Sequence, residues 1–271
     1  MVDLQAALHE GKLEEAIAAT ISEVKANPTD AESRYRLFAL IAFSGDLHRA
    51  RKQLEALGMG DEQMERAKAV YVNLLAAEQE RRAVFHHGEP PLMPPDPPEH
   101  LSLRLAALAD LREGRSEEAA AKLDEAVEKL PDCGGTLNGE PLMAWRDLDD
   151  LLGSVLEVFA GGRYMWLPLE RIQSLEIKPP SHLLDMLWLP VDVVDVHGAS
   201  TSVHVPVLYE GSHEGEDPRT ATGAVTEWMD QGAEILRGRG QRLLAWAGPD
   251  GEAHELPLLE LRSVQLESSG D

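Results

Sequence analysis

From Asn138 to Ile177 the chain reads NGEPLMAWRDLDDLLGSVLEVFAGGRYMWLPLERIQSLEI, and this stretch decides the predicted fold. Over 147–159 apolar residues recur at helical spacing, and acidic residues lie in the first turn, where the helix dipole favours negative charge. Gly161 and Gly162 follow, and glycine readily adopts the left-handed conformation that ends helices. Over 163–169 the spacing of the side chains changes from helical to a period of two, which is typical of a strand. The stretch therefore predicts a short amphipathic helix that leads directly into a strand.

Further strands are expected after this stretch. The pattern predicts strands over 163–169, 172–178, 186–196, 201–209, 241–247 and 258–265. Short strands joined by Gly-rich and Pro-rich turns favour a mostly antiparallel, partly closed β-barrel-like sheet over a parallel nucleotide-binding sheet. The polar segment 210–224 is predicted to be a loop, and loops of that length in compact domains are often functional or mobile.

The first 135 residues contain an internal repeat. The pattern Gly-x-Leu-x-x-Ala begins at Gly11, Gly45 and Gly114 and ends at Ala16, Ala50 and Ala119. The first two copies lie 34 residues apart, which is the tetratricopeptide period, and the third follows about two periods later. A small residue at each turn lets two helices approach closely. We therefore predict helix pairs that turn at these three positions, stacked as a tetratricopeptide-like αα superhelix.

Two other segments complete the first half. Residues 62–86 form one long helical pattern without repeat landmarks. Residues 88–99 carry six prolines, so this segment is expected to be an extended connection, and a proline-rich ligand for another domain is the less favoured alternative. The length of 271 residues suits two domains. We predict an α+β protein with a helical domain over 1–135 and an α+β domain over 136–271.

Composition limits the possible partners. The net charge of −23 would repel phosphate backbones and anionic lipid surfaces, so neither nucleic acid nor a membrane is expected as a partner. Residues 1–4 lack the features of a signal peptide, and no apolar run is long enough to span a bilayer, so a cytoplasmic location is expected. Cys133 is the single cysteine, which excludes an internal disulfide.

Ordered motifs along the chain resemble a known family. They are carried by Asn138, Gly139, Trp145, Asp147, Asp149, Arg163, Tyr164, Trp166, Arg171, Trp188, Tyr209, Trp228, Gln241 and Arg242. In this order and spacing the motifs resemble the ImpE/TagJ family, also called SciE-type proteins. The resemblance implies an accessory component of bacterial type VI secretion that associates with the contractile sheath or its recycling ATPase. These residues are expected to form partner contacts or core, because arginine and aromatic side chains often anchor interfaces and strand tryptophans are often buried.

The sequence offers little support for catalysis or for a cofactor. Asp147, Asp149 and Asp150 are expected to be ionised caps at an exposed helix start rather than an acid-base pair. Ser212 and His213 are adjacent, which is a poor arrangement for a nucleophile and its base. His204 and His213, with nearby carboxylates, match no ordered metal-ligand spacing. No catalytic residue, metal, cofactor or small-molecule substrate is therefore predicted.

Three functions remain open. The first is a non-catalytic adaptor of type VI secretion that holds an amphipathic helix of a sheath subunit, links the sheath to its recycling ATPase, or does both. The second is a generic tetratricopeptide scaffold. The third is an enzyme whose site lies in the strand region near Trp188, the loop 209–217 and Arg242. If the binding groove is acidic, a partly basic helix would be steered to it, and salt would slow association.

Overall fold

The computed structural model of the chain describes residues 4–58 and 62–267. Its helices over those residues are α1 (Leu4–His9), α2 (Leu13–Ala26), α3 (Ala31–Phe43), α4 (Leu47–Glu55), α5 (Glu62–His87), α6 (Glu99–Arg112) and α7 (Ser116–Glu128). The strands are β1 (Gly135–Leu137), β2 (Glu140–Leu142), β3 (Ala144–Asp147), β4 (Val155–Ala160), β5 (Arg163–Pro168), β6 (Ile172–Ile177), β7 (Trp188–Asp195), β8 (Ser200–Pro206), β9 (Thr226–Asp230), β10 (Leu236–Gly240), β11 (Leu243–Ala247), β12 (Ala253–Pro257) and β13 (Ser263–Leu266). Short 3-10 helices are η1 (Leu169–Arg171), η2 (Leu183–Met186), η3 (Ser212–Glu214) and η4 (Leu258–Glu260). Residues 1–3, which belong to the segment that argues against a signal peptide, lie outside the described residues.

Several helices turn at glycines with positive φ. Gly11 lies between α1 and α2, Gly45 between α3 and α4, and Gly114 between α6 and α7, with φ of 74°, 77° and 73°. The buried alanines Ala16, Ala50 and Ala119 each lie in the first turn of the helix that follows. A glycine accepts the left-handed turn without strain, and a small side chain lets the two helices lie close together.

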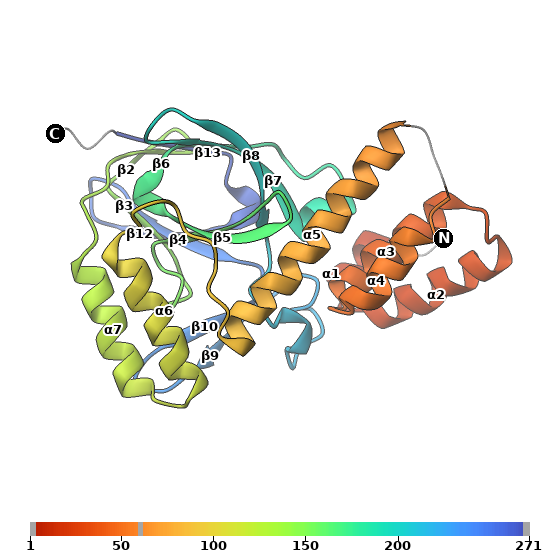
Figure 1. Cartoon of the computed structure of the whole chain (residues 1–271), viewed down its shortest axis with the longest axis horizontal. Coiled ribbons are helices and arrows are strands. Elements are labelled where there is room, and N and C mark those ends of the chain that lie inside the picture. The colour runs from red at the N-terminus through yellow and green to blue at the C-terminus, as the bar shows by residue number, and fades with distance from the viewer. Residues whose placement is uncertain (1–3, 59–61, 268–271) are drawn as a thin grey trace.

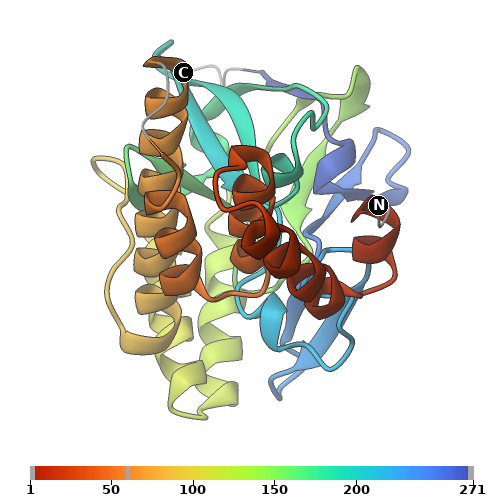
Figure 2. The ribbon, with the colours of Figure 1, turned by 90° about the vertical axis from the view of Figure 1, so that its right-hand side faces the viewer.

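The continuous superhelix that the repeat predicts is not confirmed. In Figure 1, α1–α4 lie on one side of α5, whereas α6 and α7 pair on the other side. Figure 2, viewed from the side of α1–α4, shows these helices in front of the strands, with α5 upright beside them. Helix α5 itself packs on β4 and β5. The third helix pair is therefore separated from the first two by α5 and the sheet against which α5 packs.

The main sheet has eight strands in the order β2-β1-β13-β6-β7-β8-β4-β5, and the pairs in it are antiparallel. Smaller sheets pair β10 with β9, and β11 with both β12 and β3. The predicted strands over 163–169, 172–178, 186–196, 201–209 and 241–247 correspond to β5, β6, β7, β8 and β11. The prediction over 258–265 covers η4 and most of β13.

The prediction of a partly closed barrel is wrong, because the sheet is open and its terminal strands β2 and β5 do not pair. The proline-rich segment covers the β5 edge instead. Leu92 donates its N–H to the Tyr164 carbonyl at 3.0 Å and accepts from the Trp166 N–H at 2.9 Å. Prolines on both sides of Leu92 have no N–H to offer, so this edge pairing stays one residue long. The segment is a connection, as expected, and it also protects an edge of the sheet.

The helix predicted over 147–159 is also wrong. Strand β3 ends at Asp147, a turn covers 148–154, and the rest of the segment is strand β4. Gly161 and Gly162, with φ of 57° and 83°, form the tight turn of the β4-β5 hairpin instead of ending a helix. Five of the six residues of β4 are buried, so the strand shows no polar-apolar alternation. A run that is apolar on both faces does not reveal its period.

One cluster of buried apolar side chains extends from the helices into the strands and includes Phe38 and Leu75 as well as Trp166 and Val191. The division into domains at residue 135 stays a prediction. Among the described residues, no helix combines the length and apolar character needed to cross a membrane.

Candidate functional site

A buried ionic cluster lies where α5 meets the sheet, and Glu157 is its centre. Glu157 comes from β4 and is 0% exposed. Arg81, from α5, donates Nε to its Oε1 at 2.8 Å and Nη2 to its Oε2 at 2.9 Å. Arg242, between β10 and β11, donates Nη2 to the same Oε2. The carboxylate is therefore held between two guanidinium groups from distant parts of the chain, and such charge-assisted bonds are among the strongest in proteins.

Asp147 extends the cluster at the end of β3. It accepts from Arg242 Nη1 at 2.9 Å through Oδ2, and from the Tyr209 hydroxyl at 2.7 Å through Oδ1. On the other side, Tyr164 donates its hydroxyl to Glu157, and the Trp166 indole donates to the Tyr164 oxygen at 2.6 Å. Five of the residues predicted from the family motifs, Asp147, Tyr164, Trp166, Tyr209 and Arg242, thus belong to one hydrogen-bonded network.

A second buried pair lies beside this network. Arg237 donates Nε to both oxygens of Asp149, at 2.9 Å and 2.7 Å. Asp149 is 0% exposed and also accepts from the backbone N–H groups of Gly238 and Leu151. The prediction that Asp147 and Asp149 cap an exposed helix is therefore wrong. Both carboxylates are buried, and arginines from the last part of the chain compensate their charge.

The pKa values of the two carboxylates of the cluster shift in opposite directions. Burial alone would raise the pKa of Glu157, but the guanidinium groups of Arg81 and Arg242 lower it to about 2. The pKa of Asp147 is raised to about 6, because burial outweighs the attraction of Arg242 and Asp149 adds a nearby negative charge. Proton transfer to a substrate requires a titrating group that the substrate can reach. Both carboxylates are closed to solvent, so the geometry suits a clamp between α5 and the sheet.

The residues of the enzyme hypothesis converge only in part, since Trp188, Tyr209 and His213 line one small cavity but Arg242 does not. Glu210 pairs with His86 at 3.0 Å, and the described contacts of Arg242 include neither Glu210 nor His213. His213 lines a cavity of about 30 Å³ together with Trp188, but neither Glu210 nor Arg242 lines it. This volume suits about one water molecule. Trp188 Nε1 is buried without a partner among the described residues, and an ordered water would satisfy it.

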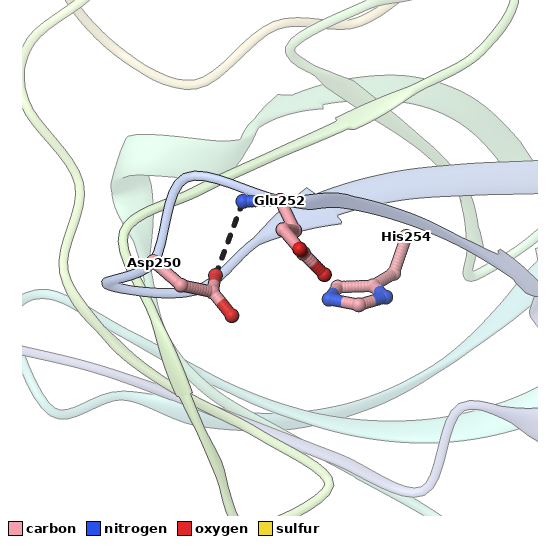
Figure 3. Close-up of side chains that lie close together, drawn as sticks. All are labelled: Asp250, Glu252 and His254. Atoms are coloured by element: carbon pink, nitrogen blue, oxygen red, sulfur yellow. Dashed lines mark hydrogen bonds between the residues drawn. The ribbon is translucent and has the colours of Figure 1, made fainter.

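One group of side chains has the residue types of a metal site. Asp250 and Glu252, in the β11-β12 turn, and His254, in β12, offer ligand atoms within 4.8 Å of one another. Figure 3 shows the three side chains close together. Asp250 accepts from the Glu252 N–H at 3.1 Å, and the His254 ring lies 4.7 Å from the Trp246 ring. All three ligand residues are exposed, and exposed acidic groups are common without a metal, so we assign no ion to them. This group does not include His204 or His213.

The tryptophans of the motifs divide into two groups. Trp145, Trp166 and Trp188 are buried. Trp228, on β9, is 37% exposed and lies with its ring 5.9 Å from that of Tyr209. Gly238 faces Tyr209 so closely that a Cβ there would come within 2.3 Å of the ring. Trp228 is therefore the tryptophan of this set that a partner can reach.

The other motif residues lie in turns and at strand ends. Asn138 and Gly139 form the β1-β2 turn, where the Asn138 side chain accepts from the N–H groups of Arg262 and Ser263. Arg163 pairs on the surface with Glu80, Arg171 donates to the Asp96 carbonyl, and Gln241 forms an isolated bridge with Leu208. These contacts hold loops in place.

Sequence reasoning missed Glu157, Arg81 and Arg237 as members of the site. One local signal existed for Glu157, since a single charge inside the apolar run VLEVF indicates a buried charge that needs a partner. The partner itself was not recognisable, because Arg81 lies in a helix with many other charged residues. Burial decides which of those charges belong to the site.

The comparisons with known proteins agree with one another. The model of the family described as "ImpE protein" matches residues 139–265. A curated relative from Pseudomonas aeruginosa (strain PAO1), named type VI secretion system accessory component TagJ, is 34% identical over 261 residues, which cover 96% of this chain and 89% of the relative. The crystal structure of protein VPA1032 from Vibrio parahaemolyticus matches with a TM-score of 0.85 and 25% identity, over 97% of both chains. With this similarity over nearly its whole length, the chain belongs to the ImpE family.

Proposed function

We propose that this chain is a non-catalytic accessory component of a type VI secretion system that binds a protein partner of that system. The 34% identity to the TagJ relative over 96% of the chain carries the assignment to this system. The closed ionic cluster supports a non-catalytic role, since its titrating groups are not open to a substrate. Within the proposal, residues 1–135 bind the partner and residues 136–271 form the support to which α5 is fixed.

The surface that we propose for the partner is a groove between α3, α4 and the first half of α5. It has a volume of about 300 Å³ and is lined almost entirely by apolar atoms. Its lining residues include Tyr35 from α3, Leu54 and Leu57 from α4 and the loop after it, and Met64 and Tyr71 from α5. The residues from α5 lie at positions 64, 67, 68 and 71, which is the spacing of one helix face. A partner helix with an apolar stripe fits such a groove.

The groove is not acidic, unlike the chain as a whole. Residues 31–71 contain seven Lys and Arg against six Asp and Glu, whereas the whole chain carries −23. The expectation that an acidic groove steers a basic helix therefore has no support at this surface. We propose instead that an amphipathic helix of a sheath subunit binds mainly through its apolar face, with weak dependence on salt. The link to the recycling ATPase remains part of the proposal, and we assign no surface to it.

Two substitutions on the same helix test the groove. Ala67 lines it, whereas Ala69 is exposed on α5 and does not line it. Ala67→Glu places a charge among apolar side chains and is expected to lower the affinity for purified sheath subunits at least about tenfold, since an unpaired buried charge costs several kcal/mol. Ala69→Glu should leave the affinity within about twofold. Binding can be measured by biolayer interferometry on the full chain, with circular dichroism as the folding check.

Equal loss of binding in both variants, or in neither, would remove the groove from the proposal. Failure of the wild-type chain to bind any sheath subunit of its own organism would remove the sheath as the partner. The accessory role would then need a different component of the secretion system.

A further inference from the structure

Arg104 is a buried arginine that forms no ion pair with a carboxylate within residues 4–58 and 62–267. It lies on α6, is 2% exposed, and donates Nη1 to the backbone carbonyls of Asp150 and Leu151 at 2.9 Å and 3.0 Å. Its Nε is buried without any partner, and Nη2 donates no hydrogen bond to the described residues. Gly153 lies against the guanidinium, and a Cβ there would come within 2.7 Å of both Nη atoms. The loop 148–154 is therefore shaped around this cation.

Two other arginines of this region each have a carboxylate partner of their own. Arg146 pairs with Asp150 at 2.7 Å, and Arg237 pairs with Asp149 at 2.7 Å. Arg104 has no carboxylate within ion-pair distance among the described residues, although Asp124, Asp150 and Glu234 line the same cavity. Burial and, to a smaller extent, the charge of Arg146 lower the pKa of Arg104 to about 10, although Asp149, Asp150 and Glu170 act in the opposite direction. A buried cation in this state favours an anion from outside the chain.

A cavity of about 260 Å³ opens beside Arg104. Arg104 and Arg146 supply its basic lining, and Leu123, Val127 and Ile235 supply apolar walls. The cavity lies between α7 and the loop that joins β9 to β10, where the Ser116 hydroxyl donates to the Gln231 carbonyl at 2.5 Å. A dry cavity of about 150 Å³ is known to hold a benzene ring, so this one has room for a carboxylate with a short aliphatic group.

We propose that this cavity binds a single carboxylate group attached to a short apolar chain, with Arg104 as the main cation that receives it. The Nη2 group of Arg104 donates a charge-assisted hydrogen bond to the ligand, Arg146 adds a second positive charge, and the apolar walls contact the aliphatic part. This site goes beyond the proposed function and does not depend on it. It lies on α6, α7 and the strand region, away from the groove of α3, α4 and α5.

The rim of the cavity restricts the charge of the ligand. Asp124 and Glu234 also line it and have no ion-pair partner among the described residues, so they repel anions that approach. A phosphate with two negative charges is disfavoured more strongly than a carboxylate with one. Two kinds of molecule carry such a carboxylate. One is a free small acid, and the other is a protein that presents its C-terminus.

Isobutyrate, with isobutyramide as its uncharged equivalent, tests the site. We expect isothermal titration calorimetry on the full chain at constant ionic strength to show millimolar binding of isobutyrate and at least about tenfold weaker binding of isobutyramide. Arg104→Met should reduce isobutyrate binding at least about tenfold. Asp124→Asn removes repulsion at the rim and should strengthen binding about twofold, whereas Glu125→Gln, at the next position of α7 but outside the cavity, should not change it.

The two sources of carboxylate are separated by a peptide. Acetyl-Ala-Ala-Val with a free C-terminus should bind at least about tenfold more tightly than isobutyrate if the natural ligand is a protein C-terminus, and its amidated form should not bind. A peptide that binds no better than isobutyrate assigns the cavity to a free small acid.

Three results would overturn the proposal. One is equal binding, or no binding, of isobutyrate and isobutyramide. Another is undiminished isobutyrate binding by folded Arg104→Met. The third applies if Arg104→Met does not fold. Equal effects of Asp124→Asn and Glu125→Gln on isobutyrate binding would then overturn the proposal, because they would show that the ligand does not enter this cavity.

Discussion

Two regions attach helices to the strands of this protein, and they treat buried arginines differently. Around Glu157, Arg81 and Arg242 each donate to a buried carboxylate. Around Arg104, the guanidinium donates to two backbone carbonyls, and the side chain lines a cavity that Asp124 and Glu234 also line. In the first region each arginine has a carboxylate partner, and in the second Arg104 has none among the described residues.

The difference separates a structural clamp from a binding site. Burying an ion pair is tolerated when every charge and lone pair has a partner, and removal of one partner leaves a costly buried charge. The Glu157 cluster satisfies this condition and ties α5 to β4, although Arg81 and Glu157 are 76 residues apart. Arg104 does not satisfy it, so a ligand can still contribute there. The following changes test this contrast, from the largest expected effect to the smallest.

Glu157→Gln should be the most damaging change. It leaves the guanidinium groups of Arg81 and Arg242 without their shared carboxylate, and breaking a buried ion pair in this way costs roughly 3–5 kcal/mol. Urea unfolding followed by circular dichroism measures the loss. The matched control is Glu55→Gln, which weakens the exposed pair with Arg51 on α4 and should cost under about 1 kcal/mol. Similar losses in both variants would contradict the description of the cluster as a clamp.

The contribution of Asp147 should depend on pH. Its folded-state pKa of about 6 lies above the ordinary value of 3.8, so the native state holds the proton more tightly than the unfolded state does. Stability from this group is therefore full below about pH 4 and is lost as the pH rises through 6. Between pH 4.5 and 7.5, the unfolding free energy of the wild type should fall by about 2 kcal/mol relative to Asp147→Asn. Parallel pH profiles of the two proteins would show that the pKa of Asp147 is not raised.

Arg104→Met should have the smallest effect on stability. The change leaves two carbonyls without their donor, at about 1 kcal/mol each, but it also removes a buried charge that has no carboxylate partner. We expect a net loss of about 1 kcal/mol, measured by the same urea unfolding. A loss as large as that of Glu157→Gln would place Arg104 in the structural class and would remove the contrast between the two regions.

Local patterns predicted much of the chain, and they failed where burial decides. The long helical pattern at 62–86 became α5, and period-two alternation located β5 to β8, because each of these segments presents one buried face to a neighbour. The segment 147–159 was misread because β4 is buried on both faces, so its apolar residues also fit a helical period. Strands β9 and β10 were missed, since β9 is mostly polar and β10 alternates arginine with glycine.

The sequence by itself determined the family, the mixed helical and strand composition, and the three glycine turns between helices, because motifs, periodicity and positive-φ positions are written in short stretches of residues. Only the tertiary structure decided that Asp147 and Asp149 are buried rather than exposed, that Glu157 joins Arg81 to Arg242, and that Arg104 has no carboxylate. Ion pairing inside a protein depends on which charges the fold removes from water together, and residues far apart in the chain meet only once the sheet and helices have packed.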